Sequence, residues 1–279
     1  MKLALCNEVL RHLSFDEQCR TAAALGYQGL EVAPFTLADD PRTLTIADAL
    51  RLKATAASHG LAISSLHWLL VQPEGLSLST TNAVLHARTV TFLKHLIDFA
   101  AACGADVLVH GSPRQRSPGP GQSVADALAR VEAGWAQLAP HAQAAGVVYC
   151  IEPLATSETP VLNTLAEAAA VVDRIASPAL RTMLDMSSAS LTETTPPAAL
   201  LNRYVASGHI AHVQLNDRNR RGPGQGDTRQ APAIRALRSL GYSGWLAVEP
   251  FDYQPDPLAC AAYCAGHVRG LLEATQGSA

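Results

Sequence analysis

Short apolar runs alternate with longer amphipathic segments along the whole chain. Each run ends on polar residues or on a glycine or proline, which is typical of buried strands, and the segments between the runs have helical spacing. The predicted strands are Leu3–Cys6, Gly29–Ala33, Ala62–His67, Asp106–His110, Val147–Glu152, Arg181–Asp185, His209–Leu215 and Trp245–Glu249. The predicted helices are Phe15–Leu25, Ile46–Ser58, Ala83–Cys103, Val124–Ala145, Leu165–Ile175, Ala231–Leu240 and Leu258–Ala274. This unbroken series of strand–helix units predicts a single-domain (β/α)8 barrel, or TIM barrel, over residues 1–279.

The competing architecture is a doubly wound sheet, which usually has a glycine-rich phosphate turn after its first strand. Here the first strand runs into Cys6-Asn7-Glu8-Val9, without such a turn. A weak internal repeat supports the barrel, because Leu25-Gly26-Tyr27-Gln28-Gly29 is echoed by Leu240-Gly241-Tyr242-Ser243-Gly244. In both copies the first glycine is predicted to end a helix in the left-handed conformation. A generic helix-to-strand turn and a true duplication both account for the repeat.

Two segments do not fit the regular alternation of predicted strands and helices. Residues 114–121 are rich in arginine, glycine and proline, and residues 218–229 contain Gly222-Pro223-Gly224-Gln225-Gly226. Both are predicted to be loops on the C-terminal face of the barrel, where barrel enzymes carry their catalytic residues.

The composition is that of an ordinary globular protein. The chain has 279 residues, 48% of them apolar, and a formal net charge of −3. This balance argues against nucleic acid or an anionic membrane as the main partner, because such binding depends on clustered lysine and arginine. The N-terminus lacks a signal-peptide pattern and no apolar stretch approaches the roughly 18 residues of a transmembrane helix, so the expected location is the cytoplasm. The six cysteines are scattered, and we expect buried reduced thiols rather than a zinc site or disulfides.

Polar side chains that can act as ligands or bases recur where the predicted strands end. They are Glu31, His67, His110, Glu152, Asp185, His212, Gln214 and Glu249. The strand ends of a barrel converge on one opening, so we expect these side chains to lie close together. Any single carboxylate could instead cap a helix or pair with an arginine. Three of them, Glu152, Asp185 and Glu249, at matching strand ends favour a shared site, because buried ionised carboxylates need a cation or hydrogen-bond donors.

The seventh strand is expected to complete this site. Strand alternation puts His212, Gln214 and Asn216 on one face. His212 lies deeper and is predicted to be a core histidine bonded to a neighbour, whereas Gln214 is nearer the rim. Three carboxylates plus either an imidazole, from His212, or an amide oxygen, from Gln214, form a hard, mostly oxygen-donor site. Such a site is suited to Mn²⁺ or Mg²⁺, with Co²⁺ as an alternative and Zn²⁺ less favoured.

Several motifs together resemble one family over nearly the whole chain. They are Ile151-Glu152-Pro153-Leu154, Leu184-Asp185, the run 208–217, the arginine-glycine loop 220–226, and Val248-Glu249-Pro250-Phe251. On these residues the chain resembles the xylose-isomerase-like TIM-barrel superfamily, which includes ketose 3-epimerases, hydroxypyruvate isomerases and inosose dehydratases.

The resemblance implies roles for individual residues. One divalent metal would be bound by Glu152, Asp185, Gln214 and Glu249, with Glu152 and Glu249 also acting as the catalytic acid and base. Ketose epimerases have histidine at the position of Gln214, whereas hydroxypyruvate-isomerase-like members have glutamine.

The resemblance also implies that Glu158 and Arg220 contact the substrate, although a solvated loop arginine is an equal alternative for Arg220. Ser188 stands where epimerases carry a substrate-binding histidine, which argues against a standard ketohexose substrate. His67 and His110, at the ends of the third and fourth predicted strands, are expected to reach the pocket as further substrate contacts; the alternative is that they bond to neighbouring backbone.

The predicted function is therefore a metal-dependent isomerase or epimerase that moves a proton next to a carbonyl group through an enediolate. A dehydratase of the inosose type and a non-catalytic metal-binding barrel subunit are the alternatives. A nuclease resembling endonuclease IV is disfavoured by the near-neutral charge and by the amide at Gln214. The expected partner is a small carbohydrate, with neither nucleic acid nor membrane, and a homo-oligomer is left open.

Overall fold

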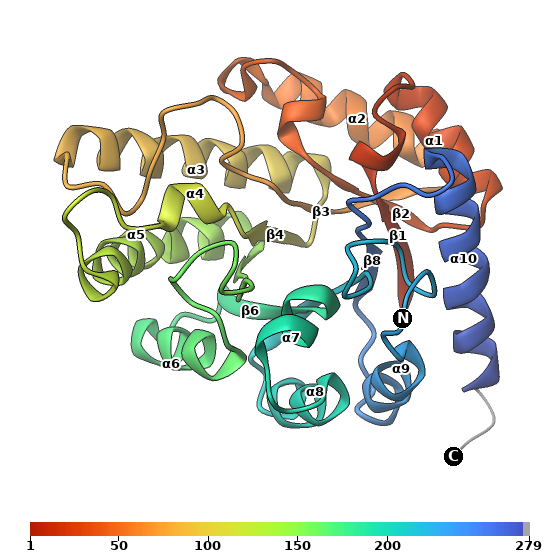
Figure 1. The fold of residues 1–279 in the computed structure, drawn as a ribbon. Helices are drawn as coiled ribbons and strands as arrows, with labels where there is room; N and C mark the ends of the chain where they lie inside the picture. Colours follow the sequence, from red (N-terminus) through yellow and green to blue (C-terminus); the bar gives the residue numbers. More distant parts are fainter. Residues whose placement is uncertain (276–279) are drawn as a thin grey trace.

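Eight parallel strands form one closed barrel in the computed structural model, which describes residues 1–275 (Figure 1). Neighbouring strands pair in sequence order, and β8 pairs with β1 to close the ring. The strands are β1 (Lys2–Cys6), β2 (Gly29–Val32), β3 (Ala62–Leu66), β4 (Val107–His110), β5 (Val148–Ile151), β6 (Leu180–Asp185), β7 (Ile210–Leu215) and β8 (Trp245–Val248). The TIM barrel predicted from the sequence is confirmed, and every predicted strand is present within one residue at its ends.

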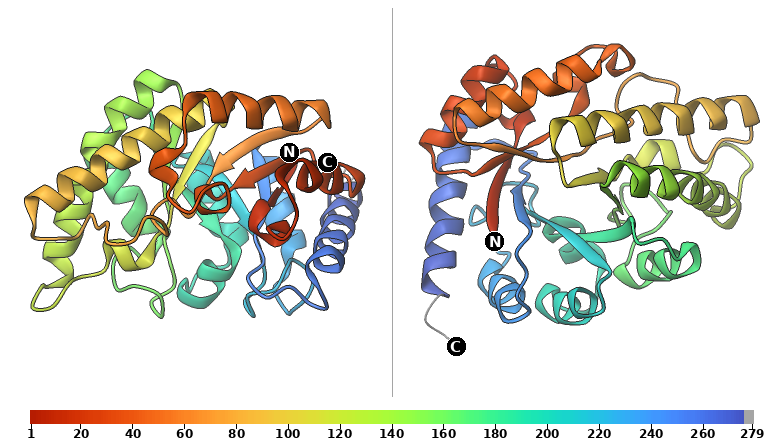
Figure 2. Two further views of the ribbon diagram at one scale, coloured as in Figure 1. Left: turned by 90° about the horizontal axis from the view of Figure 1, so that it is seen from above. Right: turned by 180° about the vertical axis from the view of Figure 1, so that it is seen from behind.

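Helices form the outer layer of the barrel (Figure 2). They are α1 (Phe15–Ala24), α2 (Ile46–Ser58), α3 (Ala83–Cys103), α4 (Pro113–Arg116), α5 (Val124–Ala145), α6 (Leu165–Ile175), α7 (Met186–Thr192), α8 (Pro197–Ala206), α9 (Gln230–Ser239) and α10 (Pro257–Ala274). Three short 3-10 turns, η1 (Asn7–Leu10), η2 (Pro34–Thr36) and η3 (Pro41–Thr43), lie in the first two connections. Helix α10 lies between α9 and the N-terminal elements and closes the ring (Figures 1 and 2).

Side-chain caps fix where several helices begin. Ser14 and Glu17 form a reciprocal capping box at α1, and Thr164 and Glu167 form another at α6. Such boxes satisfy backbone N–H groups that the first turn leaves without partners. Gly26 and Gly241 have φ angles of 86° and 68°, as predicted for left-handed residues that turn the chain into the next strand.

The sequence pattern missed three helices. No helix was expected between the sixth and seventh strands, where α7 and α8 lie, because prolines open α8 and both helices are short. The segment 114–121 was expected to be a loop, but its first residues belong to the single turn α4. Arg116 in this turn is completely buried, which an arginine-rich and proline-rich stretch does not suggest.

Two apolar regions hold the fold together. The larger one packs the outward-facing side chains of the strands against the helices. Inside the barrel, Ala4, Cys6, Trp245 and Ala247 form one small cluster, and residues of β4, β5 and β6 form another. These apolar clusters leave the carboxyl ends of the strands for polar side chains.

The expected burial of the cysteines is confirmed, since all six lie in the described part of the chain and are buried. They form no disulfide there. Within residues 1–275, no helix is long and apolar enough to cross a membrane.

The left-handed conformation of Gly241 predicts that two glycine-to-alanine variants change the stability of the protein in opposite directions. A Cβ at Gly241 would meet only open space, so Gly241→Ala should destabilise the protein by about 1 kcal/mol through its left-handed φ alone. Gly270 lies within α10 with equally open space, so Gly270→Ala should instead stabilise the protein by about 0.5–1 kcal/mol. Urea denaturation measures both, and equal effects of the two variants would contradict the assigned conformation.

Candidate active site

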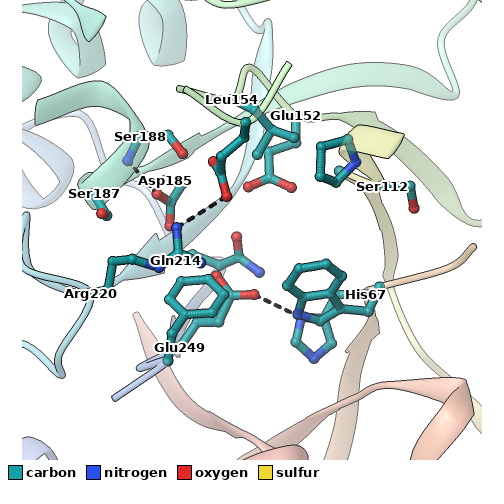
Figure 3. Close-up of a pocket in the computed structure, with 15 residues that line it drawn as sticks. His67, Ser112, Glu152, Leu154, Asp185, Ser187, Ser188, Gln214, Arg220 and Glu249 are labelled. Atoms are coloured by element: carbon teal, nitrogen blue, oxygen red, sulfur yellow. Dashed lines mark hydrogen bonds and ion pairs between the residues drawn. The ribbon is translucent and has the colours of Figure 1, made fainter. Parts of the chain in front are cut away.

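A pocket opens at the carboxyl ends of the strands (Figure 3). It is lined by His67, Trp68, Gly111, Ser112, Pro113, Glu152, Leu154, Glu158, Asp185, Ser187, Ser188, Gln214, Arg220, Glu249 and Phe251. All the site residues predicted from the sequence are among them except His110.

Three carboxylates from three strands meet in this pocket. Glu152 follows β5, Asp185 ends β6 and Glu249 follows β8, and their exposed fractions are 8%, 4% and 4%. Burial and the charges of Glu249 and Asp185 raise the pKa of Glu152 well above its ordinary value. Burial also raises the pKa of Asp185 to about 6 and that of Glu249 to about 8. The neighbouring positive groups, His67 beside Glu249 and Arg116 beside Glu152, therefore do not fully offset the burial of these carboxyls.

Backbone and amide donors orient Asp185. The backbone N–H of Ser188 donates to Asp185 Oδ1 at 2.6 Å, and Asn216 Nδ2 donates to Asp185 Oδ2 at 2.5 Å. Asn216 Oδ1 in turn accepts from the backbone N–H of Ser187 at 2.7 Å. The start of α7 and the end of β7 thus hold one carboxylate from both sides.

Gln214 presents an acceptor that has no donor. Its Nε2 donates to Glu31 Oε1 at 2.6 Å, and its Oε1 is buried without a hydrogen-bond partner among the described residues. A buried amide oxygen without a partner costs free energy unless a cation or a ligand meets it. Together with the three carboxylates, this oxygen fits a divalent cation.

Glu31 lies below Gln214 and is completely buried. Burial opposes its ionisation, but the rings of His212 and His67 lower the pKa of Glu31 below its ordinary value. His212 Nε2 lies 2.6 Å from Glu31 Oε2, which is the place predicted for a core histidine. Because an ionised carboxylate only accepts hydrogen bonds, the amide nitrogen of Gln214 must face Glu31.

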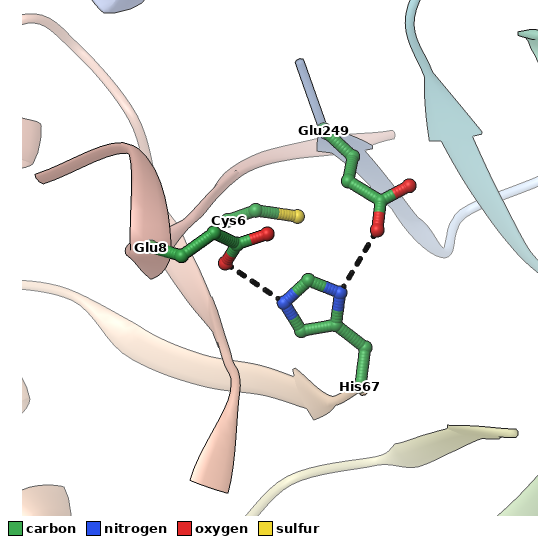
Figure 4. Close-up of side chains that lie close together, drawn as sticks. All are labelled: Cys6, Glu8, His67 and Glu249. Carbon is green, nitrogen blue, oxygen red and sulfur yellow. Dashed lines mark hydrogen bonds and ion pairs between the residues drawn. The ribbon is translucent and has the colours of Figure 1, made fainter. Parts of the chain in front are cut away.

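His67 joins two carboxylates (Figure 4). Its Nδ1 lies 3.1 Å from Glu249 Oε1 and its Nε2 lies 3.0 Å from Glu8 Oε2. Burial opposes its protonation, but the charges of Glu8 and Glu31 raise the pKa of His67 well above its ordinary value. The ring lines the pocket as predicted, yet both its nitrogens are engaged by carboxylates, so it holds Glu249 in place.

The same corner contains a second set of potential metal ligands. One ligand atom each of Cys6, Glu8, His67 and Glu249 lies within 4.8 Å of the others. The side chains in this set already have hydrogen-bond partners, since His67 bonds two carboxylates and Cys6 Sγ donates to Glu31 at 3.2 Å. Burial and the charge of Glu31 also raise the pKa of the Cys6 thiol, which keeps it protonated. A cation is therefore favoured at the first set, where an acceptor lacks a partner.

An ion pair and two aromatic rings form another part of the pocket wall. Arg220 Nη1 donates to Glu158 Oε1 at 3.1 Å, and its guanidinium lies 4.0 Å from the ring centroid of Phe251. Phe251 meets Trp68 edge to face with centroids 6.2 Å apart. Trp68 was not predicted from the sequence, although it directly follows the predicted strand end at His67.

Strained backbone conformations are concentrated in this pocket. Trp68, Ser112 and Arg220 have φ angles of 52°, 45° and 67°. Non-glycine residues rarely adopt such angles, and they persist where the surrounding structure enforces them. The three side chains are thus held in directions that ordinary strand or turn geometry would not give.

His110 is not brought to the pocket, which corrects the sequence expectation. Its Nδ1 lies 2.6 Å from Tyr149 Oη and 3.2 Å from Trp135 Nε1, and burial lowers its pKa to about 3. The next residue, Gly111, lines the pocket instead, and a Cβ there would collide with the carboxylate of Glu152. The sequence analysis thus selected His110, whereas the adjacent residue Gly111 forms this part of the pocket wall.

Two further supporting residues were missed by sequence reasoning. Arg116 Nη1 donates to the backbone carbonyl of Glu152 at 2.6 Å and so holds the chain from which that carboxylate projects. Glu8 binds His67 from below. Position after the first strand was the only signal for Glu8. Arg116 lies in the segment 114–121 that was predicted on the catalytic face, but nothing distinguished it from the other polar residues there.

Comparisons with known proteins agree with this architecture. The family model described as xylose isomerase-like TIM barrel matches residues 19–264. A probable ketose 3-epimerase of Synechocystis sp. is 24% identical over 247 residues, which are 85% of this chain and 78% of the relative. A D-psicose 3-epimerase of Enterocloster bolteae is 34% identical over 118 residues, but this match covers 42% of this chain and 38% of that enzyme.

The solved structure of a 3-keto-D-glucoside 4-epimerase from E. coli has a TM-score of 0.84 to this chain, with 18% sequence identity, and covers 97% of this chain and 99% of that chain. At this identity the likeness concerns the fold. The match of the family model shows that the chain belongs to the xylose isomerase-like TIM-barrel family.

The raised pKa values predict how stability depends on pH. Glu152, Glu249 and His67 bind protons more tightly in the folded state, so the folded protein holds more protons than the unfolded chain between about pH 6.5 and 8. The free energy of unfolding should therefore fall as the pH rises through this range in the presence of a chelator. Excess Mg²⁺ should reduce this fall, because a cation replaces the protons on Glu152 and Glu249. Urea denaturation at about pH 6.5 and about pH 8 measures the free energy of unfolding. A rise of this free energy with pH in the presence of chelator would contradict the raised pKa values of these groups.

Proposed function

We propose that this protein is a divalent-metal-dependent epimerase or isomerase of a neutral polyhydroxy ketone. The observation that carries the proposal is the meeting of Glu152, Asp185 and Glu249 with the unpartnered oxygen of Gln214 in one pocket. The names of the relatives support a sugar epimerase, since two of those described above are ketose or psicose 3-epimerases.

Four side chains would hold the metal: Glu152, Asp185, Gln214 and Glu249. Their oxygen donors favour Mn²⁺ or Mg²⁺, with Co²⁺ as an alternative and Zn²⁺ less favoured. A bound cation would supply Lewis-acid stabilisation of the negative charge that develops on the carbonyl oxygen.

The two glutamates supply the proton chemistry. Glu152 and Glu249 approach the pocket from different sides (Figure 3). One carboxylate removes the proton next to the carbonyl, which leaves an enediolate. Return of a proton by the other carboxylate to the opposite face gives epimerisation, whereas its return to the neighbouring carbon by the first gives isomerisation. Arg116 and Gly111 place Glu152 for this step, and His67 places Glu249.

The charge of the pocket supports an uncharged substrate. Four carboxylates line it, and the guanidinium of Arg220 is already paired with Glu158. The divalent cation, Arg220 and the ring of His67, whose pKa is raised, together only balance these four negative charges. A phosphate or carboxylate group on the substrate would therefore lose its hydration without a free positive charge to replace it.

Replacing either glutamate tests the proton transfer. Glu152→Gln and Glu249→Gln should each lower kcat by about 100- to 10,000-fold, because an amide cannot exchange a proton at that carbon. Glu273→Gln on the exposed face of α10 is the matched control and should keep wild-type activity. Conversion of a panel of ketoses, followed by NMR, measures the rates. Full activity in either pocket variant would contradict the proposal.

Substrate charge gives an independent prediction. Neutral ketoses should exceed hydroxypyruvate and ketose phosphates in kcat/KM by at least about tenfold. Glu158→Gln removes the partner of Arg220 and should narrow this ratio, because it frees one positive charge at the pocket wall. A wild-type preference for the anionic compounds would show that the pocket charge has been misassigned.

A further inference from the structure

Glu31 on β2 touches a predicted metal ligand although it does not line the pocket. It is completely buried, and its Oε1 accepts from Gln214 Nε2 at 2.6 Å across the barrel interior. We infer that Glu31 sets the orientation of the Gln214 amide, so that oxygen rather than nitrogen is presented to the divalent cation. This inference rests on the metal site of the proposed function.

The two ends of an amide have nearly the same shape, so packing alone does not choose between them. The hydrogen-bond partners of the Gln214 amide therefore determine which of its two ends faces Glu31. Around Glu31, the hydroxyl of Ser65 and the thiol of Cys6 donate to the carboxylate, and His212 Nε2 lies 2.6 Å away. Glu31 is therefore an acceptor, and the amide group of Gln214 turns its NH2 toward it.

The reversed amide would be unfavourable in two ways. Its oxygen would lie against the carboxylate of Glu31, and two acceptors at this distance repel each other. Its NH2 group would face the cation, and an amide nitrogen has no free electron pair to donate to a metal.

The pocket carboxylates would attract that same NH2 group when no cation is present. Glu31 opposes this attraction, because it binds the NH2 from the opposite side. The unpartnered state of Gln214 Oε1 is the expected result of this competition. Glu31 is a positioning residue, since it acts on the cation only through Gln214.

The test is Mn²⁺ affinity, measured by titration calorimetry and by the EPR signal of free Mn²⁺. Glu31→Gln is nearly isosteric but can donate to Gln214 Oε1 and stabilise the reversed amide. It should weaken Mn²⁺ binding by about 10- to 100-fold. Ser65→Ala is the matched control, because it removes a neighbour of Glu31 and keeps the bond to Gln214. Its Mn²⁺ affinity should stay within about threefold of wild type.

An exchange variant separates orientation from a merely structural role. In the double variant E31Q/Q214E, the residue at position 214 offers an oxygen in either orientation, and the amide at position 31 can donate to it. Mn²⁺ affinity should return to within about threefold of wild type or exceed it. Affinity as weak as that of Glu31→Gln would overturn the inference.

The outcomes distinguish this inference from the proposed function. If wild-type protein binds no Mn²⁺, the metal site itself is wrong. If wild type and Glu31→Gln bind Mn²⁺ equally, the site stands and the role of Glu31 is wrong. If Glu31→Gln does not fold, the exchange variant decides alone, and its failure to fold or to bind Mn²⁺ contradicts the inference.

Discussion

The structure depends on concentrated negative charge at the carboxyl end of a closed barrel. Closure brings the ends of β5, β6 and β8 together, so Glu152, Asp185 and Glu249 share a buried space. Like charges at close range in a poorly solvated site repel strongly. Burial raises the pKa values of all three carboxyls, and neighbouring negative charges raise them further. A divalent cation is the simplest chemical species that stabilises the ionised carboxylates in such a site.

A second layer of polar groups beneath the pocket holds the first layer in place. Each contact has a directional reason: Asn216 orients Asp185, His67 orients Glu249, and Glu31 orients Gln214. Below this layer the barrel is filled by small apolar clusters around Trp245 and Met183. These closely packed apolar side chains support the polar network and limit how far its side chains can shift.

Much of this arrangement was predictable because strand periodicity and strand-end chemistry are local signals. The alternation of His212, Gln214 and Asn216 gave their common face, and the matching strand ends gave the three carboxylates. Other features depend on contacts that sequence distance hides. Arg116 looked like part of an exposed loop, but it is buried against the carbonyl of Glu152. His110 lies against Tyr149 and Trp135 instead of in the pocket, and Gly111 lines the wall, because one residue of register decides which position faces inward.

A crystal structure of the Mn²⁺-soaked protein, with anomalous diffraction at the manganese edge, is the most direct test of the metal site. One strong peak is expected, with oxygen ligands from Glu152, Asp185, Gln214 and Glu249 at about 2.0–2.3 Å. A peak bound instead by Cys6, Glu8 and His67, or no peak at all at saturating Mn²⁺, would contradict this expectation.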